Sequence, residues 1–407
     1  MIIRARTVVT MDGLAIEDGA VAIEGKRIVE VGRAADLLQG STEEVLDLGE
    51  MVLLPGLINA HCHLDYSMMR HAIARPRSFT AWVQRINALK RCLDSDDYLA
   101  AIIRGFSELK RWGTTGVANI EAFPELMVQL GPSPIRTWWF YEMIDIRHRI
   151  TTDDVVAGAL SFFQHRANSL DSFGLSPHAP YTASVSLFQL ANECATTFTM
   201  PLTTHVAESA EEFAMLHDAS GPLYDFMKSL QRPMSDCGYE TPFGQLWKNG
   251  AIHGGWLLAH MNELREEDFQ IMEGLPRGSG PSIVHCPGSH FYFGHADFHY
   301  RRLHELGVNL CLGTDSLAST DTLSLFEEMR RLQGAEPWIS GEQLLRTVTT
   351  NPARALGRRD VLGRIAPGAF ADLIALPASG TVRDIHEEIV QFAAPVPWMM
   401  IDGQVIS

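Results

Sequence analysis

The chain has 407 residues, with 33 Lys and Arg against 49 Asp and Glu, so its formal charge at pH 7 is −16. This acidic balance argues against a nucleic-acid-binding protein, which needs a basic surface. Apolar residues make up 46% of the chain and charged residues 20%, which supports a large buried core and excludes both an intrinsically disordered chain and a membrane protein.

The first fifty residues have the pattern of short antiparallel strands. Apolar and polar residues alternate in short runs, separated by turn-forming pairs such as Asp12-Gly13 and Gly25-Lys26. Residues 1–10 lack the apolar stretch that a secretory leader carries. The six cysteines are scattered without a CxxC pair, as is typical of reduced thiols. We therefore expect a small β unit here and a cytoplasmic protein.

Residues 55–363 follow a different pattern, in which short β-branched or apolar runs alternate with longer stretches of helical periodicity. Such alternation is typical of βα units around a parallel sheet, and eight parallel strands close a barrel. The predicted fold class is therefore α/β, a (β/α)8 TIM-type barrel. Its strands are expected to end at His61, Asn119, Tyr141, His178, His205, His260, His285 and Asp315.

The strand pattern returns after Gly363, in residues 372–376 and 399–406. We expect these strands to join those of the N-terminus, because a small domain can be built from both ends of a chain. The predicted organisation is a small β-sandwich domain of residues 1–54 and 364–407 and a barrel of residues 55–363. No apolar run approaches the ~18 residues of a membrane-spanning helix.

Polar residues at the ends of three predicted strands form a candidate metal site. His61 and His63 lie one residue apart, and alternate side chains of a strand point to the same face, so both imidazoles can reach one ion. His205 and Asp315 end two other strands, and catalytic groups of barrel enzymes gather at such ends. Three imidazoles and one carboxylate suit a divalent ion such as zinc, with room for water. The alternative for Asp315 is the N-cap of a helix.

Four segments carry a resemblance to a known family, and they are Pro55–Leu64, His205–Glu208, Leu312–Ser316 and Pro367–Leu373. They resemble the motifs of the amidohydrolase superfamily, and within it the branch of mononuclear-metal deaminases and triazine hydrolases. The resemblance covers essentially the whole chain. It implies a metal-dependent hydrolase.

By this resemblance, one divalent metal ion is held by His61, His63, His205 and Asp315. The ion is expected to be Zn2+, with Fe2+ as the alternative. Binuclear relatives carry a carboxylated lysine at the end of the fourth strand, whereas this chain has His178 there. The resemblance therefore implies a single ion.

The resemblance also implies three catalytic residues, Glu208, His260 and Asp315. Attack of water on an aromatic carbon needs a proton shuttle, because the ring nitrogen gains a proton as the carbon becomes tetrahedral. Glu208 fills that role in similar deaminases; the alternative is a carboxylate that caps a helix. His260 would hold the attacking water or the departing group, and Asp315 would accept the other proton of the water. We expect Glu211 and Glu212 to be solvated.

Four residues are candidates for substrate binding: His178, Trp82, Arg147 and His290. The segment around His178 resembles one that places a His beside the nucleoside in deaminases of S-adenosylhomocysteine and 5′-methylthioadenosine; the alternative is a hydrogen bond within its own loop. The segment before Trp82 looks closer to the aminodeoxyfutalosine deaminases. Trp82 either covers the pocket or packs in the first helix. Arg147 is a candidate anchor for a carboxylate, and His290 stands where the family commonly has Asn.

We therefore predict a hydrolase of a non-peptide carbon–nitrogen bond, a deaminase that releases ammonia from a 6-aminopurine nucleoside. One alternative is an amino or chloro hydrolase of an s-triazine or another heterocycle. A non-catalytic binding homologue is an alternative of another class. The expected partner is a small-molecule substrate. We expect no binding to nucleic acid or to a membrane, and the sequence leaves open whether the protein forms a homo-oligomer.

Overall fold

The computed structural model describes residues 1–146, 151–163 and 170–406. The chain divides into two compact units. The first consists of Met1–Ala60, Ser107–Val117 and Ser324–Ser407, and the second of His61–Phe106 and Ala118–Leu323. The domain boundaries predicted from the sequence, at residues 54/55 and 363/364, stay a prediction.

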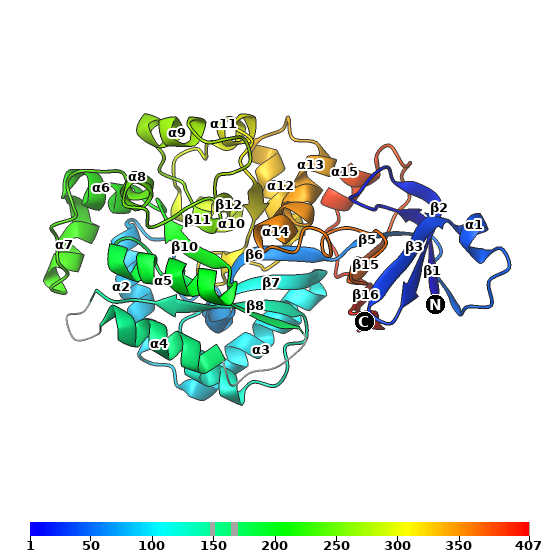
Figure 1. Cartoon of the computed structure of the whole chain (residues 1–407), viewed down its shortest axis with the longest axis horizontal. Helices are drawn as coiled ribbons and strands as arrows, with labels where there is room; N and C mark the ends of the chain where they lie inside the picture. Colours follow the sequence, from blue (N-terminus) through cyan, green and yellow to red (C-terminus); the bar gives the residue numbers. More distant parts are fainter. Residues whose placement is uncertain (147–150, 164–169, 407) are drawn as a thin grey trace. The chain divides into compact units, whose positions relative to one another are not determined.

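The two ends of the chain together build a small β unit, as predicted, and the strands of the expected β-sandwich form one mixed β-sheet. Its strands are β1 (Ile2–Val8), β2 (Ile16–Glu24), β3 (Arg27–Arg33), β4 (Val45–Asp47), β5 (Met51–Pro55), β15 (Leu373–Pro377), β16 (Trp398–Ile401) and β17 (Gln404–Val405). The order is β17-β16-β15-β5-β1-β2-β3, with β4 paired to β1. Both termini lie in this sheet (Figure 1). Its core joins residues of both ends, including Ile3, Val21, Leu53, Leu373 and Met400.

The second sheet is the predicted barrel, whose strands follow one another in chain order and run parallel. The eighth strand is split, so that β13 pairs with β12 and β14 pairs with β6, which closes the ring. The (β/α)8 fold class is thereby confirmed. The strands are β6 (Leu57–His63), β7 (Thr114–Glu121), β8 (Arg136–Met143), β9 (Asp171–Pro177), β10 (Leu202–Val206), β11 (Trp256–His260), β12 (Ser282–His285), β13 (Leu310–Leu312) and β14 (Asp315–Ser316).

Helices alternate with these strands along the chain, and α5 packs beside β9 and β10 (Figure 1). Several begin at a Ser or Thr, such as Ser78, Ser184 and Thr241, whose side chain accepts a hydrogen bond from a backbone N–H of the first turn.

No helix in the described ranges has the length and apolar composition needed to cross a membrane. The α-helices are α1 (Ala34–Leu38), α2 (Phe79–Lys90), α3 (Ser95–Arg111), α4 (Thr152–Phe163), α5 (Val185–Phe198), α6 (Ala210–Asp218), α7 (Gly221–Ser229), α8 (Pro242–Lys248), α9 (Glu266–Glu273), α10 (Pro287–Phe293), α11 (Tyr300–Glu305), α12 (Leu325–Ala335), α13 (Gly341–Thr347), α14 (Thr350–Ala355) and α15 (Ile385–Val390), and the 3-10 helices are η1 (Leu64–Met69) and η2 (Pro124–Gln129).

The barrel strands bring polar groups to one edge of the sheet. Every residue of β6, β7, β10 and β11 is buried, because these parallel strands are covered on both faces. Their predicted ends lie within two residues of the observed ones. His61 and His63, His205, and His260 therefore lie where parallel strands end together.

Candidate active site

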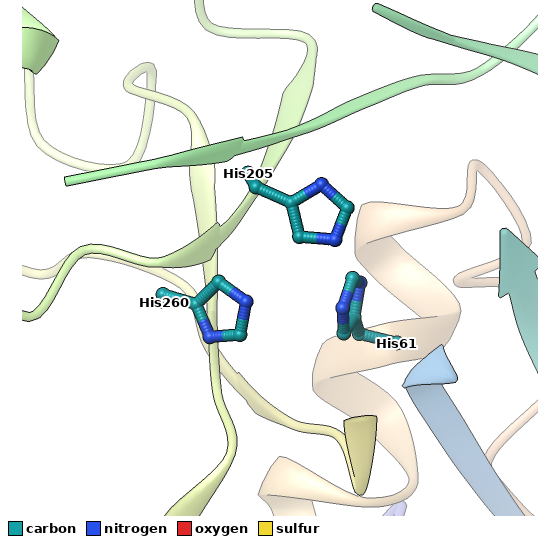
Figure 2. A group of neighbouring side chains, drawn as sticks. All are labelled: His61, His205 and His260. Atoms are coloured by element: carbon teal, nitrogen blue, oxygen red, sulfur yellow. The ribbon is translucent and has the colours of Figure 1, made fainter. Parts of the chain in front are cut away.

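The structure brings together all four residues that the sequence suggests as metal ligands. The Nε2 atoms of His63 and His205 are 3.1 Å apart. Asp315 Oδ1 lies 3.9 Å from the Nε2 atoms of both His61 and His63. His260 joins the group, and Figure 2 shows its ring around a common space with those of His61 and His205. Ligand atoms of His61, His205 and His260 all lie within 4.8 Å of one another, as do those of His61, His63 and Asp315.

The protonation of these histidines suits a metal ion. Burial, followed by the nearby His178, lowers the pKa of His61 to about 3, and burial, followed by His61, lowers the pKa of His205 to about 3. Neutral imidazoles are the form that binds metals. Two nitrogens bound to a tetrahedral zinc at about 2.0–2.1 Å stand about 3.3 Å apart, close to the observed separation of His63 and His205. The residues present therefore fit one divalent ion.

Hydrogen bonds outside the cluster orient two of these side chains. The Nδ1 of His205 donates to the carbonyl of His178 at 2.8 Å, so in the neutral ring the lone pair lies on Nε2, which faces the cluster. The Oδ2 of Asp315 accepts from the hydroxyls of Ser289 at 2.6 Å and Ser319 at 2.9 Å. Its Oδ1 is thereby directed toward the histidines. The alternative N-cap role of Asp315 finds no support, since α12 begins later, at the N-cap Ser324.

The backbone at this edge of the barrel is strained. Ala207, His260 and Asp315 have φ values of 51°, 75° and 57°, in the left-handed region that non-glycine residues rarely adopt. Each such residue costs roughly 1–3 kcal/mol and persists only where its surroundings hold it. Three strained residues at the same edge of the barrel are typical of a functional site.

Glu208 lies beside the cluster with its carboxylate inside the barrel mouth. Its Oε1 is 3.7 Å from His260 Nε2, and the ligand atoms of Glu208, His260 and Asp315 lie within 4.8 Å of one another. Burial, followed by the charges of Asp315 and Glu212, raises the pKa of Glu208 well above its usual value. The cap of α6 is instead Ser209, whose side chain accepts from the backbone N–H of Glu212.

The expectation that Glu211 and Glu212 are solvated is wrong. Glu212 is fully buried, and Glu211 is half-buried and accepts from the backbone N–H groups of Phe79 and Thr80. Both carboxylates bind N–H donors that have no partner of their own in a helix or strand. A run of acidic residues after a strand end gives no sign of such contacts.

A cavity of about 430 Å³ opens next to the cluster. His178 and Trp82, both predicted as substrate contacts, line it. Trp82 also packs against Phe293, with ring centroids 5.1 Å apart, so both of its anticipated roles are compatible with the structure. The apolar wall consists of Phe79, Trp82, Val83, Ile86, Ile144, Ile146, Tyr181, Phe226, Met227 and Leu230.

His178 is held by its own loop and still faces the cavity. Its Nδ1 is 2.6 Å from the hydroxyl of Thr182, and its Nε2 lies 3.9 Å from Glu142 Oε1. Burial, followed by the charge of Lys90, lowers the pKa of His178 to about 3. A neutral ring therefore offers Nε2 to whatever occupies the cavity.

Of the two other predicted substrate contacts, the structure describes only His290. Arg147 lies outside the described residues. Among the described residues, the wall of the cavity does not include His290. His290 lies on α10, where its Nδ1 is 3.0 Å from Asn262 Oδ1. Substrate contact by either residue stays a prediction.

Three cavity residues were missed by sequence reasoning. Tyr66 stacks on His63 with ring centroids 5.5 Å apart, and Lys90 Nζ donates to the Tyr66 hydroxyl at 2.6 Å. Glu142, next to the last residue of β8, also lines the cavity. Lys90 lies two helical turns after Trp82, so the helical period places both on one face of α2. That spacing was a usable signal for Lys90.

Comparison with known proteins identifies the family to which the chain belongs. The sequence model of the amidohydrolase family matches residues 52–406. The chain belongs to the amidohydrolase family. It is accordingly a hydrolase that acts on carbon–nitrogen bonds.

Two proteins with similar sequences are both named as deaminases. A 5-methylthioadenosine/S-adenosylhomocysteine deaminase of Pyrococcus furiosus is 29% identical over 388 residues, which is 92% of this chain and 85% of that protein. An aminodeoxyfutalosine deaminase of Deinococcus radiodurans is 28% identical over 360 residues, 85% of this chain and 83% of that protein.

Solved structures share the fold. The zinc-bound crystal structure of an adenosine deaminase from Xanthomonas campestris aligns with a TM-score of 0.81 at 25% identity, over 99% of this chain and 92% of that one. Helicobacter pylori aminofutalosine deaminase aligns with a TM-score of 0.85 at 22% identity, over 100% and 99% of the two chains. Family membership, the zinc of the first structure and the His/Asp cluster together indicate that this protein has a metal site.

Proposed function

We propose that the protein is a hydrolytic deaminase of a 6-aminopurine nucleoside of the aminodeoxyfutalosine, 5′-methylthioadenosine or S-adenosylhomocysteine type, and that it releases ammonia. The observation that carries the proposal is the place of the Glu208 carboxylate, 3.7 Å from His260 and beside Asp315 at an aromatic cavity. The named activities of the relatives at 29% and 28% identity support the same reaction.

The proposed ligands of a single ion are His61, His63, His205 and Asp315. We propose Zn2+ as this ion, with Fe2+ as the alternative, because three neutral imidazoles and one carboxylate suit either metal. When bound, the ion would activate water and stabilise negative charge.

The side chains of the chain itself handle the protons. Glu208, whose pKa is raised by burial, takes a proton from the attacking water and delivers it from Oε1 to the purine ring nitrogen. His260 and Asp315 have ligand atoms within 4.8 Å of that of Glu208. Their side chains exchange hydrogen bonds with the attacking water and the departing amino group. Asp315 accepts the second proton of the water and passes it to the amino group, which leaves as ammonia, and the ring carbon keeps the oxygen of the water.

The cavity suits a nucleoside. The rings of Phe79 and Trp82 are 6.2 Å apart and nearly parallel, so they form one aromatic wall for a planar base. His178 presents Nε2 for a hydrogen bond with the nucleoside. The polar groups of Asn87, Lys90 and Glu142 then face the remainder of the substrate.

The test is ammonia release by purified protein whose metal content is known from elemental analysis. The panel consists of adenosine, 5′-methylthioadenosine, S-adenosylhomocysteine, aminodeoxyfutalosine, guanine, cytosine and melamine. We expect turnover of one or more of the aminopurine nucleosides. Turnover of melamine or of free bases alone would overturn the proposed substrate class, and silence across the panel with metal bound would overturn deamination.

A further inference from the structure

The peptide groups on both sides of Glu208 are held by side chains that do not line the cavity. The two carboxylate oxygens of Glu212 accept from the backbone N–H groups of Ala207 at 3.0 Å and of Glu208 at 2.7 Å. On the other side, Asn262 Nδ2 donates to the Glu208 carbonyl at 2.9 Å. Glu212 is 0% exposed and Asn262 4%, so water does not compete for these bonds.

The orientation of Asn262 is in turn fixed by His290. A backbone carbonyl only accepts, so the amide nitrogen of Asn262 faces Glu208 and its Oδ1 faces away. His290 Nδ1 lies 3.0 Å from that Oδ1 and therefore carries the proton. The hydrogen bonds thus run in one direction, from His290 through Asn262 to Glu208.

The backbone before Glu208 needs this support. Ala207 has φ of 51°, a conformation that a residue with a Cβ leaves unless neighbouring groups hold it. Its N–H is bound by Glu212 and its carbonyl by the N–H of Glu263 at 2.9 Å. Rotation of this peptide would turn the Cα–Cβ bond of Glu208 away from His260.

We propose that Glu212, Asn262 and His290 are positioning residues, which fix the backbone of Glu208 and so aim its carboxylate at the reacting atoms. This inference rests on the proposed function of Glu208. Glu212 is also the third residue of α6 after the N-cap Ser209. An ordinary capping carboxylate binds the N-cap backbone; that of Glu212 interacts with the N-cap Ser209 and also reaches further back, to Ala207 and Glu208.

The test uses substitutions that keep shape and remove one hydrogen-bonding function. N262D replaces the donor by an oxygen that repels the Glu208 carbonyl, and E212Q places an NH2 group against a backbone N–H. We expect kcat to fall about 10- to 100-fold, because misplacement by about 1 Å has that effect. KM and metal content should change less than about twofold, since neither residue contacts substrate or metal ligands.

A matched control separates positioning from helix capping. Asp268 is buried, occupies the same third position of α9 and accepts from the N-cap backbone of Arg265 at 2.9 Å. D268N should lower the melting temperature and leave kcat unchanged. H290F, at a half-buried site, keeps an aromatic ring and removes the donor to Asn262 together with the contact to the Ala296 backbone. It should lower kcat several-fold and covers the case in which the buried variants fail to fold.

A double-mutant cycle decides the route of the effect. In the E208Q background the same substitutions should change the residual kcat less than about twofold, because the group they position is gone. Wild-type kcat in N262D, E212Q and H290F, or equal losses in the E208Q background, would overturn the proposal. Wild-type turnover by E208Q alone would overturn the proposed function, and the inference with it.

Discussion

At the scale of single residues, the candidate site depends on side chains whose orientation is set by their neighbours. Asp315 directs one carboxylate oxygen toward the histidines because two serine hydroxyls hold the other. His205 offers Nε2 because the carbonyl of His178 accepts its Nδ1–H. Each group therefore has one available atom, and substitutions should separate metal binding from proton transfer.

Glu208→Gln should retain metal and lose turnover. The amide has the size of the carboxyl group but cannot accept and return a proton, so kcat should fall about 10²- to 10⁴-fold. Steady-state kinetics and elemental analysis measure both effects. The control is Glu193→Gln, an exposed carboxylate on α5, which should leave kcat unchanged. Near-wild-type kcat in the Glu208 variant would remove the proposed mechanism.

Asp315→Ala should lower both metal content and activity. The substitution removes a charged ligand of the metal. Loss of a residue that only supports a ligand already lowers metal affinity about 10- to 100-fold, so loss of the ligand itself should lower it more than about tenfold. Ser319→Ala removes only one of the two hydroxyls that hold Asp315, so its effect should be smaller and of the same kind. One metal per chain retained in Asp315→Ala would show that the fourth ligand is misassigned.

At the scale of elements, α2 carries the cavity wall and its first turn is bound to the loop after β10. Glu211 accepts from the N–H groups of Phe79 and Thr80, and Ser78 accepts from Ala81. The start of the helix is thus fixed by Glu211, which lies three residues after Glu208 in the sequence. We infer that α2 sets the distance between its aromatic face and the catalytic groups.

Trp82→Leu should weaken substrate binding more than chemistry. Loss of an aromatic stacking contact removes about 1 kcal/mol, so KM should rise several-fold to about tenfold while kcat changes little. The comparison is Trp247→Leu, a partly buried tryptophan on α8 that does not line the cavity. Equal KM values in wild type and Trp82→Leu would mean that Trp82 only packs within its helix.

At the scale of the whole molecule, closure of the barrel places the first and last strands in contact at the site. The split in the eighth strand falls at Gly313, where an added Cβ would lie 2.8 Å from the Cβ of His61. Thr314 N–H donates to the His61 carbonyl at 3.1 Å. Ring closure and the position of a metal ligand therefore depend on the same glycine.

Gly313→Ala should destabilise the protein by about 1–3 kcal/mol, the usual range for overpacking, and should also lower metal content because it displaces His61. Gly334→Ala, in α12 with nothing within 4 Å of the added Cβ, should be neutral or stabilising by about 0.5–1 kcal/mol. Denaturant unfolding and elemental analysis measure both variants. Unchanged stability in Gly313→Ala would contradict the close approach.

The sequence by itself determined the alternation of strands and helices and the polar ends of the strands. Buried parallel strands read as continuous apolar runs, and a polar residue at the end of such a run is visible in the local pattern. His61, His63, His205 and Asp315 were found in this way as a ligand set and, with the family resemblance, His260 as a catalytic residue, and the structure brings the five side chains together.

Only the tertiary structure decided which loop and helix residues meet that edge. Glu212 belongs to an acidic run that looks solvated, yet it is buried against the backbone of Glu208. Glu142 lines the cavity, whereas His290 lies behind Asn262. Glu142 and His290 reach their places only after distant segments have packed, and the burial of Glu212 depends on that packing too, so no local period or spacing encodes these positions. The strand ends can be predicted from the short-range sequence pattern. The residues that hydrogen-bond to the backbone of Glu208 are decided by tertiary packing.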